Sequence, residues 1–214
     1  MGHDVGAGAG LSRKAAALRP TSTRETVLDV GCGTGSLAIA AKIQVGPAGK
    51  VYGIDSSSNM LARARKKARK AGVEVTFEQA PARALPFPDG HFDAVLSTVM
   101  LHHLPHIGRT ECAREMRRVL KPGGRVLAVD FAEPEGEEKG FLSHFHRHGH
   151  VMPREIDGLL TDAGFKLVES GAVGFKNLHL RSRRRRDQQA ADGPDHAGSR
   201  RRLSRARHLG RGRH

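Results

Sequence analysis

Tryptophan is absent from this chain of 214 residues, which holds only one tyrosine and two cysteines. The cysteines, Cys32 and Cys112, form no disulfide framework and fit no metal-binding spacing, so we expect a reducing compartment. No apolar run is long enough to span a bilayer, and the N-terminal stretch MGHDVGAGAGLSRK lacks the apolar core of a signal peptide. The sequence therefore predicts a cytoplasmic protein without a transmembrane segment.

The positive charge of the chain is unevenly distributed. The net charge is +14, and residues 181–214 hold twelve arginines and three aspartates, a net of +9, which leaves +5 for residues 1–180. The basic character therefore belongs to the C-terminal segment and not to a folded surface. We predict a disordered N-terminus over residues 1–10, a single domain over residues 11–180 and an Arg-rich disordered tail over residues 181–214.

Short apolar runs alternate with helical patterns through the domain. We expect strands at 26–30, 50–55, 73–79, 92–97, 125–131 and 165–170. Helices are expected at 11–18, from 36 to 43, from 57 to 71, around 112–120 and at 153–162. Alternation of strands and helices over the first 130 residues predicts an α/β fold whose mostly parallel sheet is covered on both faces.

A glycine-rich loop follows the first strand and opens a helix. It reads Asp29-Val-Gly31-Cys-Gly33-Thr-Gly35, at the edge where open α/β sheets bind ligands. A GxGxxG dinucleotide fingerprint would place its third glycine at Ser36, which disfavours a nicotinamide-dependent oxidoreductase. An acid beside a helix N-terminus suits a cationic ligand group better than a pyrophosphate.

Asp55 ends the second strand, about twenty residues beyond the glycine loop. An acid at this position can accept hydrogen bonds from both hydroxyls of a ribose, as in dinucleotide-binding folds. The alternative is that Asp55 only caps the following helix.

Four stretches resemble the class I S-adenosylmethionine-dependent methyltransferases, in the branch that modifies quinones, sterols and other small molecules. They are VLDVGCGTGSLAIA, VYGIDSSSNML, ALPFPDGHFDAVLSTVMLHHL and RRVLKPGGRVLAVDF, and the resemblance covers about residues 24–180. It implies a Rossmann-like sheet of seven strands in which the last strand is antiparallel and inserts beside strand five. It also implies S-adenosyl-L-methionine as the cofactor.

The resemblance assigns roles to residues of this chain. The methionine end of the cofactor would be held by Asp29, Gly31, Cys32, Gly33, Thr34 and Gly35, with Ser97 and Thr98 beneath it. Asp55 and Ser56 would lie at the ribose, and Met60, Ala80 and Pro81 at the adenine. Pro81 departs from the family pattern, because the family usually has an aspartate there that binds the adenine amino group.

Methyl transfer needs a base only where the acceptor must lose a proton. The candidates are His102 and His103, after the fourth strand, and Asp130, at the end of the fifth. Each histidine can instead be a capping or packing residue. The run HFHRHGH (144–150) suggests a substrate wall or a metal site, and we predict no metal because no acid or cysteine accompanies it.

The segment after the fourth strand reads STVMLHH and carries no aromatic residue that could stack a nucleobase. We therefore predict methyl transfer to a small, apolar or lipid-like acceptor and expect no specific nucleic acid. A cofactor-binding remnant without activity and a basic RNA-associated protein remain the alternatives.

The seventh strand is expected to begin near KNLH (176–179) and to be incomplete. The family continues with an apolar run, whereas this chain continues with Leu180-Arg181-Ser182-Arg183. One set of codons for these four residues, read one base later, encodes Phe-Val-Leu-Ala. The tail could thus derive from a frameshift, which resequencing of the coding DNA would test, and the alternative is a disordered basic arm for RNA or anionic surfaces.

Overall fold

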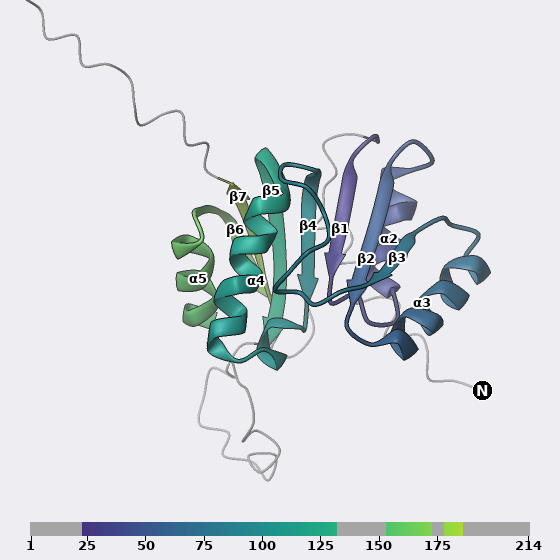
Figure 1. Ribbon diagram of the computed structural model, residues 1–214. Helices are drawn as coiled ribbons and strands as arrows, with labels where there is room; N and C mark the ends of the chain where they lie inside the picture. Colours follow the sequence, from purple (N-terminus) through teal and green to yellow (C-terminus); the bar gives the residue numbers. More distant parts are fainter. Residues whose placement is uncertain (1–22, 132–152, 173–177, 186–214) are drawn as a thin grey trace, which may run out of the picture.

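Seven strands form one sheet, in the order β3-β2-β1-β4-β5-β7-β6, in the computed structural model, which describes residues 23–131, 153–172 and 178–185 (Figure 1). The strands are β1 (Thr26–Val30), β2 (Lys50–Asp55), β3 (Thr76–Gln79), β4 (Phe92–Thr98), β5 (Leu120–Phe131), β6 (Phe165–Ala172) and β7 (Leu178–Arg185). The helices are α2 (Ser36–Val45), α3 (Ser58–Lys70), α4 (His106–Val119) and α5 (Pro153–Asp162), with a short 3₁₀ helix, η1 (Leu101–His103).

The topology confirms the predicted fold class. Strands β1 to β5 pair in parallel, and β7 lies antiparallel between β5 and β6. The strands β1 and β2 have the predicted bounds. The apolar run of β1 ends at a glycine turn, and that of β2 ends at a charged residue. The carboxyl ends of the parallel strands meet at one edge of the sheet, the lower edge in Figure 1.

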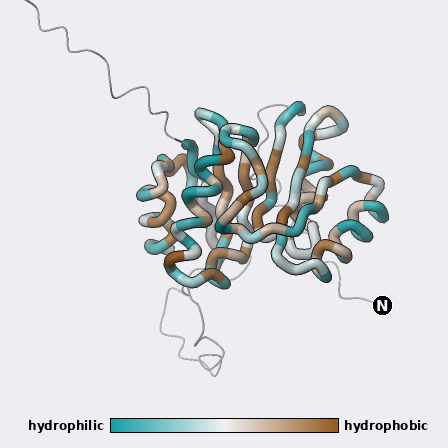
Figure 2. Tube along the Cα trace, viewed as in Figure 1, coloured by the Kyte–Doolittle hydropathy of each residue, from teal (hydrophilic) through white to brown (hydrophobic). Residues whose placement is uncertain are grey.

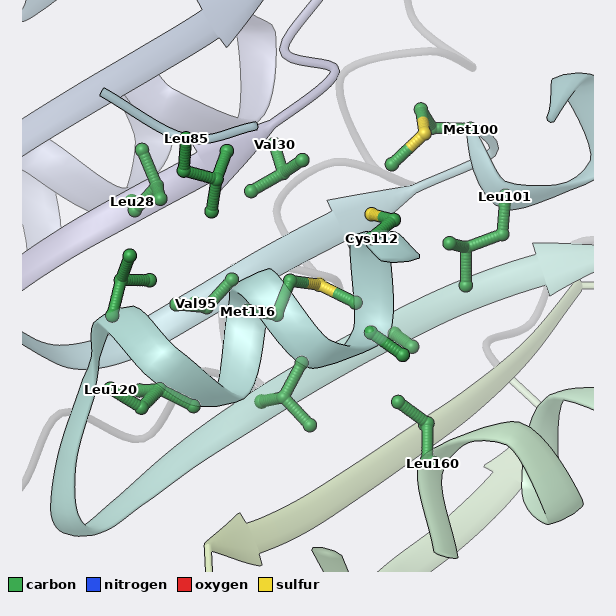
Figure 3. Packing of buried hydrophobic residues seen from close by; sticks show 14 of the residues in the cluster. Leu28, Val30, Leu85, Val95, Met100, Leu101, Cys112, Met116, Leu120 and Leu160 are labelled. Carbon is green, nitrogen blue, oxygen red and sulfur yellow. The ribbon is translucent and has the colours of Figure 1, made fainter. Parts of the chain in front are cut away.

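Two apolar layers cover the two faces of the sheet. Alternate residues of β1 take part in each: Val27 packs with α2 and α3, whereas Leu28 and Val30 pack with α4 and α5. Figure 3 shows the second layer, in which Met116 of α4 lies beside Val95 of β4. Burial on both faces explains the continuous apolar strands, seen as brown segments inside the molecule in Figure 2.

The expectation of an incomplete seventh strand is wrong. Strand β7 continues to Arg185 and pairs with β5 as far as Arg184 opposite Arg125, and with β6 as far as Arg185 opposite Phe165. Ladder hydrogen bonds use only the backbone, so arginines can complete the sheet if their side chains find partners. The strand thus extends five residues past the domain boundary predicted at residue 180.

Strand β7 accommodates its arginines through acceptors on neighbouring elements. The guanidinium of Arg183 is buried and donates to Asp157 Oδ1 (2.6 Å) and Thr161 Oγ1 (2.9 Å) of α5. Arg185 donates to the main-chain oxygens of Arg117 (3.2 Å) and Leu120. The predicted disordered ends and the frameshift hypothesis concern segments that, apart from 181–185, lie outside the described residues.

Candidate functional site

A pocket of about 340 Å³ lies at the carboxyl ends of the central strands. Its size is within the range of small-molecule sites. The residues that line it come from the ends of β1 and β2 and from the segments after β3 and β4: Gly31, Ile54, Asp55, Ser56, Ala80, Pro81, Ala82, Arg83, Met100, His103 and Leu104. This is the edge at which open α/β sheets bind ligands.

The glycine loop and Asp55 are hydrogen-bonded to each other. The N–H of Gly33 donates to Asp55 Oδ2 (2.8 Å), and the N–H of Ser57 donates to Asp55 Oδ1 (2.9 Å). Gly31 has a φ of 70°, and a Cβ atom there would lie 2.3 Å from Met100 Cγ. Only glycine meets both conditions, so the loop backbone forms part of the pocket wall beside Asp55.

Asp29 is buried directly before this loop. Its Oδ2 has no hydrogen-bond partner among the described residues, and the residue is only 2% exposed. Burial raises the pKa of this carboxyl from 3.8 to about 7; the charge of Asp55 adds to the shift and a hydrogen bond from the Ala38 backbone opposes it. An isolated buried carboxylate is costly unless a cation pairs with it. Asp29 is therefore poised for a cationic ligand group.

Two more buried polar atoms lack partners at the end of β4, within the part of the chain that the structure describes. They are Ser97 Oγ and Thr98 Oγ1. The next residue, Val99, has a φ of 53°, a left-handed conformation that is strained for a β-branched side chain. Its N–H donates to the carbonyl of Val129 (2.7 Å), which anchors the turn to β5. The strained turn leads directly to Met100 on the pocket wall.

His102 and Asp130 form a pair beside the pocket. Nδ1 of His102 lies 2.8 Å from Asp130 Oδ1, and the backbone N–H of His102 donates to Oδ2 of the same carboxylate (3.3 Å). The carboxylate is 2% exposed and the imidazole 16%. The ring of His103 lies 3.9 Å from that of His102 and lines the pocket. A carboxylate on Nδ1 fixes the ring and leaves Nε2 as the other functional atom.

The segment after β3 is held by α4. Glu115 accepts from the N–H of Leu85 (2.8 Å), and Arg118 donates to the carbonyls of Leu85 (3.0 Å) and Phe87 (2.8 Å). The hydrogen bond from Arg118 lowers the pKa of Glu115, so this support persists at neutral pH. It fixes the segment that carries Arg83 to the pocket, and the guanidinium of Arg83 has no hydrogen bond or ion pair with described residues.

The structure distributes the predicted cofactor residues in two groups. Gly31, Asp55, Ser56, Ala80 and Pro81 line the pocket. The remainder do not line it: Asp29, Cys32, Gly33, Thr34, Gly35, Met60, Ser97 and Thr98. Most of these lie behind the wall or beside it, at the ends of β1 and β4, whereas Met60 lies in the first turn of α3 and is exposed.

Cys32 is a packing residue of the first apolar layer. It lies in the core with α2 and β3, and burial, with the charges of Asp29 and Asp55, raises the pKa of its thiol. Such a thiol stays protonated, so it contributes no nucleophile. Of the predicted catalytic residues, His102 and Asp130 meet in the pair described above, and His103 reaches the pocket.

Sequence reasoning missed five lining residues: Ile54, Ala82, Arg83, Met100 and Leu104. Each lies within two positions of a predicted residue, and this proximity is the one signal that could have included them. The described residues contain no group of three or more His, Cys, Asp or Glu side chains that could hold a metal ion, and the His run 144–150 lies outside them. No helix within the described ranges is long and apolar enough to cross a membrane.

Comparisons with known proteins agree with this architecture. Residues 27–124 match the family model of a methyltransferase domain. The chain is 34% identical over 142 residues (65% of this chain, 55% of the relative) to the ubiquinone/menaquinone biosynthesis C-methyltransferase of Pectobacterium atrosepticum. It is 44% identical over 110 residues (50% and 42%) to that of Pseudomonas paraeruginosa. The chain thus spans about half the length of the curated relatives it matches.

A solved structure supports the same assignment. A SAM-dependent methyltransferase from Aquifex aeolicus superposes with a TM-score of 0.67 at 25% identity, over 81% of this chain and 88% of that one. S-adenosyl-L-methionine is the cofactor that this family uses. The seven-stranded sheet of this order, the glycine loop hydrogen-bonded to Asp55 and these matches support a class I S-adenosylmethionine-dependent methyltransferase.

Proposed function

We propose that this chain transfers the methyl group of S-adenosyl-L-methionine to a small, lipid-like acceptor. The observation that carries the proposal is the buried, unpartnered Oδ2 of Asp29 beside a pocket that also holds Asp55. The relatives named above are C-methyltransferases of ubiquinone and menaquinone biosynthesis. Their chemistry supports a quinone-like ring as the acceptor and carbon as the methylated atom. The cytoplasmic location stays a prediction.

The residues present fit the cofactor. The ammonium group of its methionine end is the cation that the carboxylate of Asp29 lacks, and the hydroxyls of Ser97 and Thr98 offer further polar contacts there. Each oxygen of Asp55 accepts one backbone N–H and keeps a lone pair that can accept from a ribose hydroxyl. The close approach of Gly31 to Met100 leaves no side chain between the loop backbone and the ligand.

The cofactor, when bound, supplies an electrophilic methyl group on a sulfonium. The task of the protein is to align the acceptor, exclude water and remove a proton from the acceptor where that is needed. We assign the proton transfer to Nε2 of His102, because Asp130 holds the ring at Nδ1 and stabilises the imidazolium. His103, which lines the pocket and contacts the ring of His102, is assigned to acceptor positioning.

The other readings have less support. Glycines at positions 31, 33 and 35 and the methyltransferase match disfavour a nicotinamide-dependent oxidoreductase. The RNA-associated reading rests mainly on residues beyond Arg185, outside the described ranges. A remnant without activity would keep cofactor binding and lose transfer, so the two functions must be measured separately.

Calorimetric titration of the full-length chain with S-adenosylhomocysteine tests the cofactor assignment. We expect saturable binding near 1 µM, about −8 kcal/mol. A folded sample that binds nothing would refute the assignment.

Transfer of a labelled methyl group to a panel of demethylated quinols and phenols tests the reaction. His102→Gln should lower kcat by about 10² or more while the Kd of S-adenosylhomocysteine stays unchanged. Asp130→Asn should also lower kcat. His106→Gln, at an exposed position of α4, is the matched control and should leave kcat unchanged. Equal turnover by wild type and His102→Gln would remove His102 from the mechanism. Binding without transfer to any acceptor would favour the remnant.

A further inference from the structure

The strand order determines which end of the pocket would receive the nucleobase. Asp55 ends β2, which lies between β1 and β3 in the sheet. The unpartnered atoms of Asp29, Ser97 and Thr98 lie at the ends of β1 and β4, on one side of Asp55. If Asp55 holds the ribose, as the proposed function requires, the charged end of the cofactor extends toward β1 and β4. The base then lies on the other side, at the segment Ala80–Arg83 that follows β3.

No side chain of this segment can accept a hydrogen bond from the amino group of adenine. Ala80 and Ala82 are apolar, and Pro81 has neither a polar side chain nor an N–H. The N–H of Ala80 already donates to the carbonyl of Asp55 (3.2 Å), and the carbonyl of Pro81 accepts from Ala84 (3.1 Å). Among the described lining residues, Asp55 is the only carboxylate, and the ribose engages it. The exocyclic amino group of adenine is a donor, and the side chains of the segment Ala80–Arg83 offer it no acceptor.

Arg83 gives this end of the pocket the opposite chemistry. Arg83 lines the pocket, and its guanidinium has no partner among the described residues. A guanidinium carries five donors and no acceptor, and its plane stacks well on aromatic rings. It can therefore stack on any purine and can donate to a carbonyl at position 6, but it cannot accept from an amino group. A 6-oxo purine suits these donors at least as well as a 6-amino purine.

We propose that Arg83 contacts the nucleobase and that this site distinguishes poorly between 6-amino and 6-oxo purines. S-inosylhomocysteine, which carries hypoxanthine in place of adenine, is then bound about as tightly as S-adenosylhomocysteine. A site that reads a ligand N–H with a dedicated acceptor rejects an analogue lacking it by about 10⁴-fold or more. The inference rests on the proposed binding of the adenosyl cofactor.

The test is calorimetric titration of the full-length chain with both nucleosides. We expect the two Kd values to differ by less than about tenfold, because neither base is left facing a buried acceptor without its donor. Pro81→Asp supplies a carboxylate and should raise the preference for the adenosyl compound by about tenfold or more. Arg83→Ala should weaken both ligands by a similar factor of about five or more. Arg114→Ala, at an exposed position of α4, is the matched control and should change neither Kd.

The outcomes separate this inference from the proposed function. A wild-type preference for the adenosyl compound above about tenfold would overturn the selectivity, and unchanged Kd values in Arg83→Ala would overturn the base contact. Failure of both ligands to bind a sample that circular dichroism shows to be folded would instead reject the proposed cofactor, and the inference with it. Because Pro81 and Arg83 are both exposed, the variants should fold, and the same spectra would verify this.

Discussion

Asp29 and Arg183 are two ionisable residues buried in the same sheet, and they differ in whether neighbouring side chains pair with them. Asp29 on β1 is 2% exposed and Arg183 on β7 is 4% exposed. Oδ2 of Asp29 has no partner among the described residues, whereas Arg183 binds Asp157 and Thr161. A buried charge that lacks a partner is unstable unless a ligand supplies one. The comparison therefore separates the proposed ligand site at β1 from a structural adaptation at β7.

The buried groups at β1 and at β7 have different consequences for the protein. At β1, the cost of a buried carboxylate appears as the raised pKa of Asp29 and is useful only if a cation binds. At β7, one nitrogen of the buried arginine, Nε, is also left without a described partner, but its two terminal nitrogens are paired. Because these nitrogens are paired, no ligand is needed, and β7 can be completed between β5 and β6.

The largest effect is expected from Asp29→Asn. The change keeps the shape of the side chain and removes its charge, so the affinity for S-adenosylhomocysteine should fall by about 100-fold or more. Calorimetric titration measures this. Asp162→Asn, at an exposed position of α5, is the control and should bind as the wild type does. An Asp29→Asn protein that binds within threefold of the wild type would mean that Asp29 is not the partner of the ligand cation.

The next effect is expected at the other buried charge. Asp157→Ala leaves Arg183 without its carboxylate, which should lower the free energy of unfolding by about 2 kcal/mol; the usual cost of such a change is larger, but Asp157 is partly exposed. Adding Arg183→Leu should recover most of that loss, because the unpaired charge is then gone. Urea unfolding of the two variants, with Asp162→Ala as control, measures both steps. A double variant no more stable than Asp157→Ala would refute the structural role of the pair.

A smaller effect is the pH dependence of binding. With a folded pKa of about 7, the Asp29 carboxyl must lose a proton before a cation can pair with it. The affinity for S-adenosylhomocysteine should therefore rise with pH, by about tenfold in Kd between pH 6 and pH 8. Titrations at a series of pH values should show this slope in the wild type and lose it in Asp29→Asn. A wild-type affinity that is flat over this range would contradict the raised pKa.

The unliganded protein gives an independent check with the opposite sign. Because the folded pKa of Asp29 lies above its unfolded value of 3.8, the folded state keeps a proton that the unfolded chain has already lost. Its contribution to stability is full below pH 3.8 and is lost as the pH rises through about 7. Asp29→Asn should therefore gain stability relative to the wild type over that window, and a constant difference would argue against the raised pKa.

Local signals explain why the β1 side of the molecule was predictable. The apolar run 26–30, the glycines after it and Asp55 at the end of the next strand lie close together in the sequence, and the structure keeps those bounds. The hydrogen bond between Gly33 and Asp55 joins residues 22 apart, through the parallel pairing of β1 and β2. Pattern and spacing are enough to predict this arrangement of glycine loop and acid.

Non-local contacts explain what the sequence did not reveal. Histidine and aspartate candidates could be named, but the pairing of His102 with Asp130 depends on the register between β4 and β5. Strand β7 was expected to stop at its arginines because an apolar run was expected. What allows it to continue is Asp157, 26 residues from Arg183 and on a different element. Such a partner cannot be read from the strand itself.

The smallest effect is expected at a surface position of the same strand. Arg184 is exposed and lies directly opposite Arg125 on β5 and Lys166 on β6, so three cations form a row across the sheet. Like charges in opposite positions destabilise a sheet, and Arg125 already has a partner in Glu25 (2.7 Å). Arg184→Glu should raise the free energy of unfolding by about 0.5 kcal/mol, a gain that 1 M salt should reduce. Arg114→Glu on α4 is the control for the change in net charge, and an equal gain there would assign the effect to net charge and not to the row on the sheet.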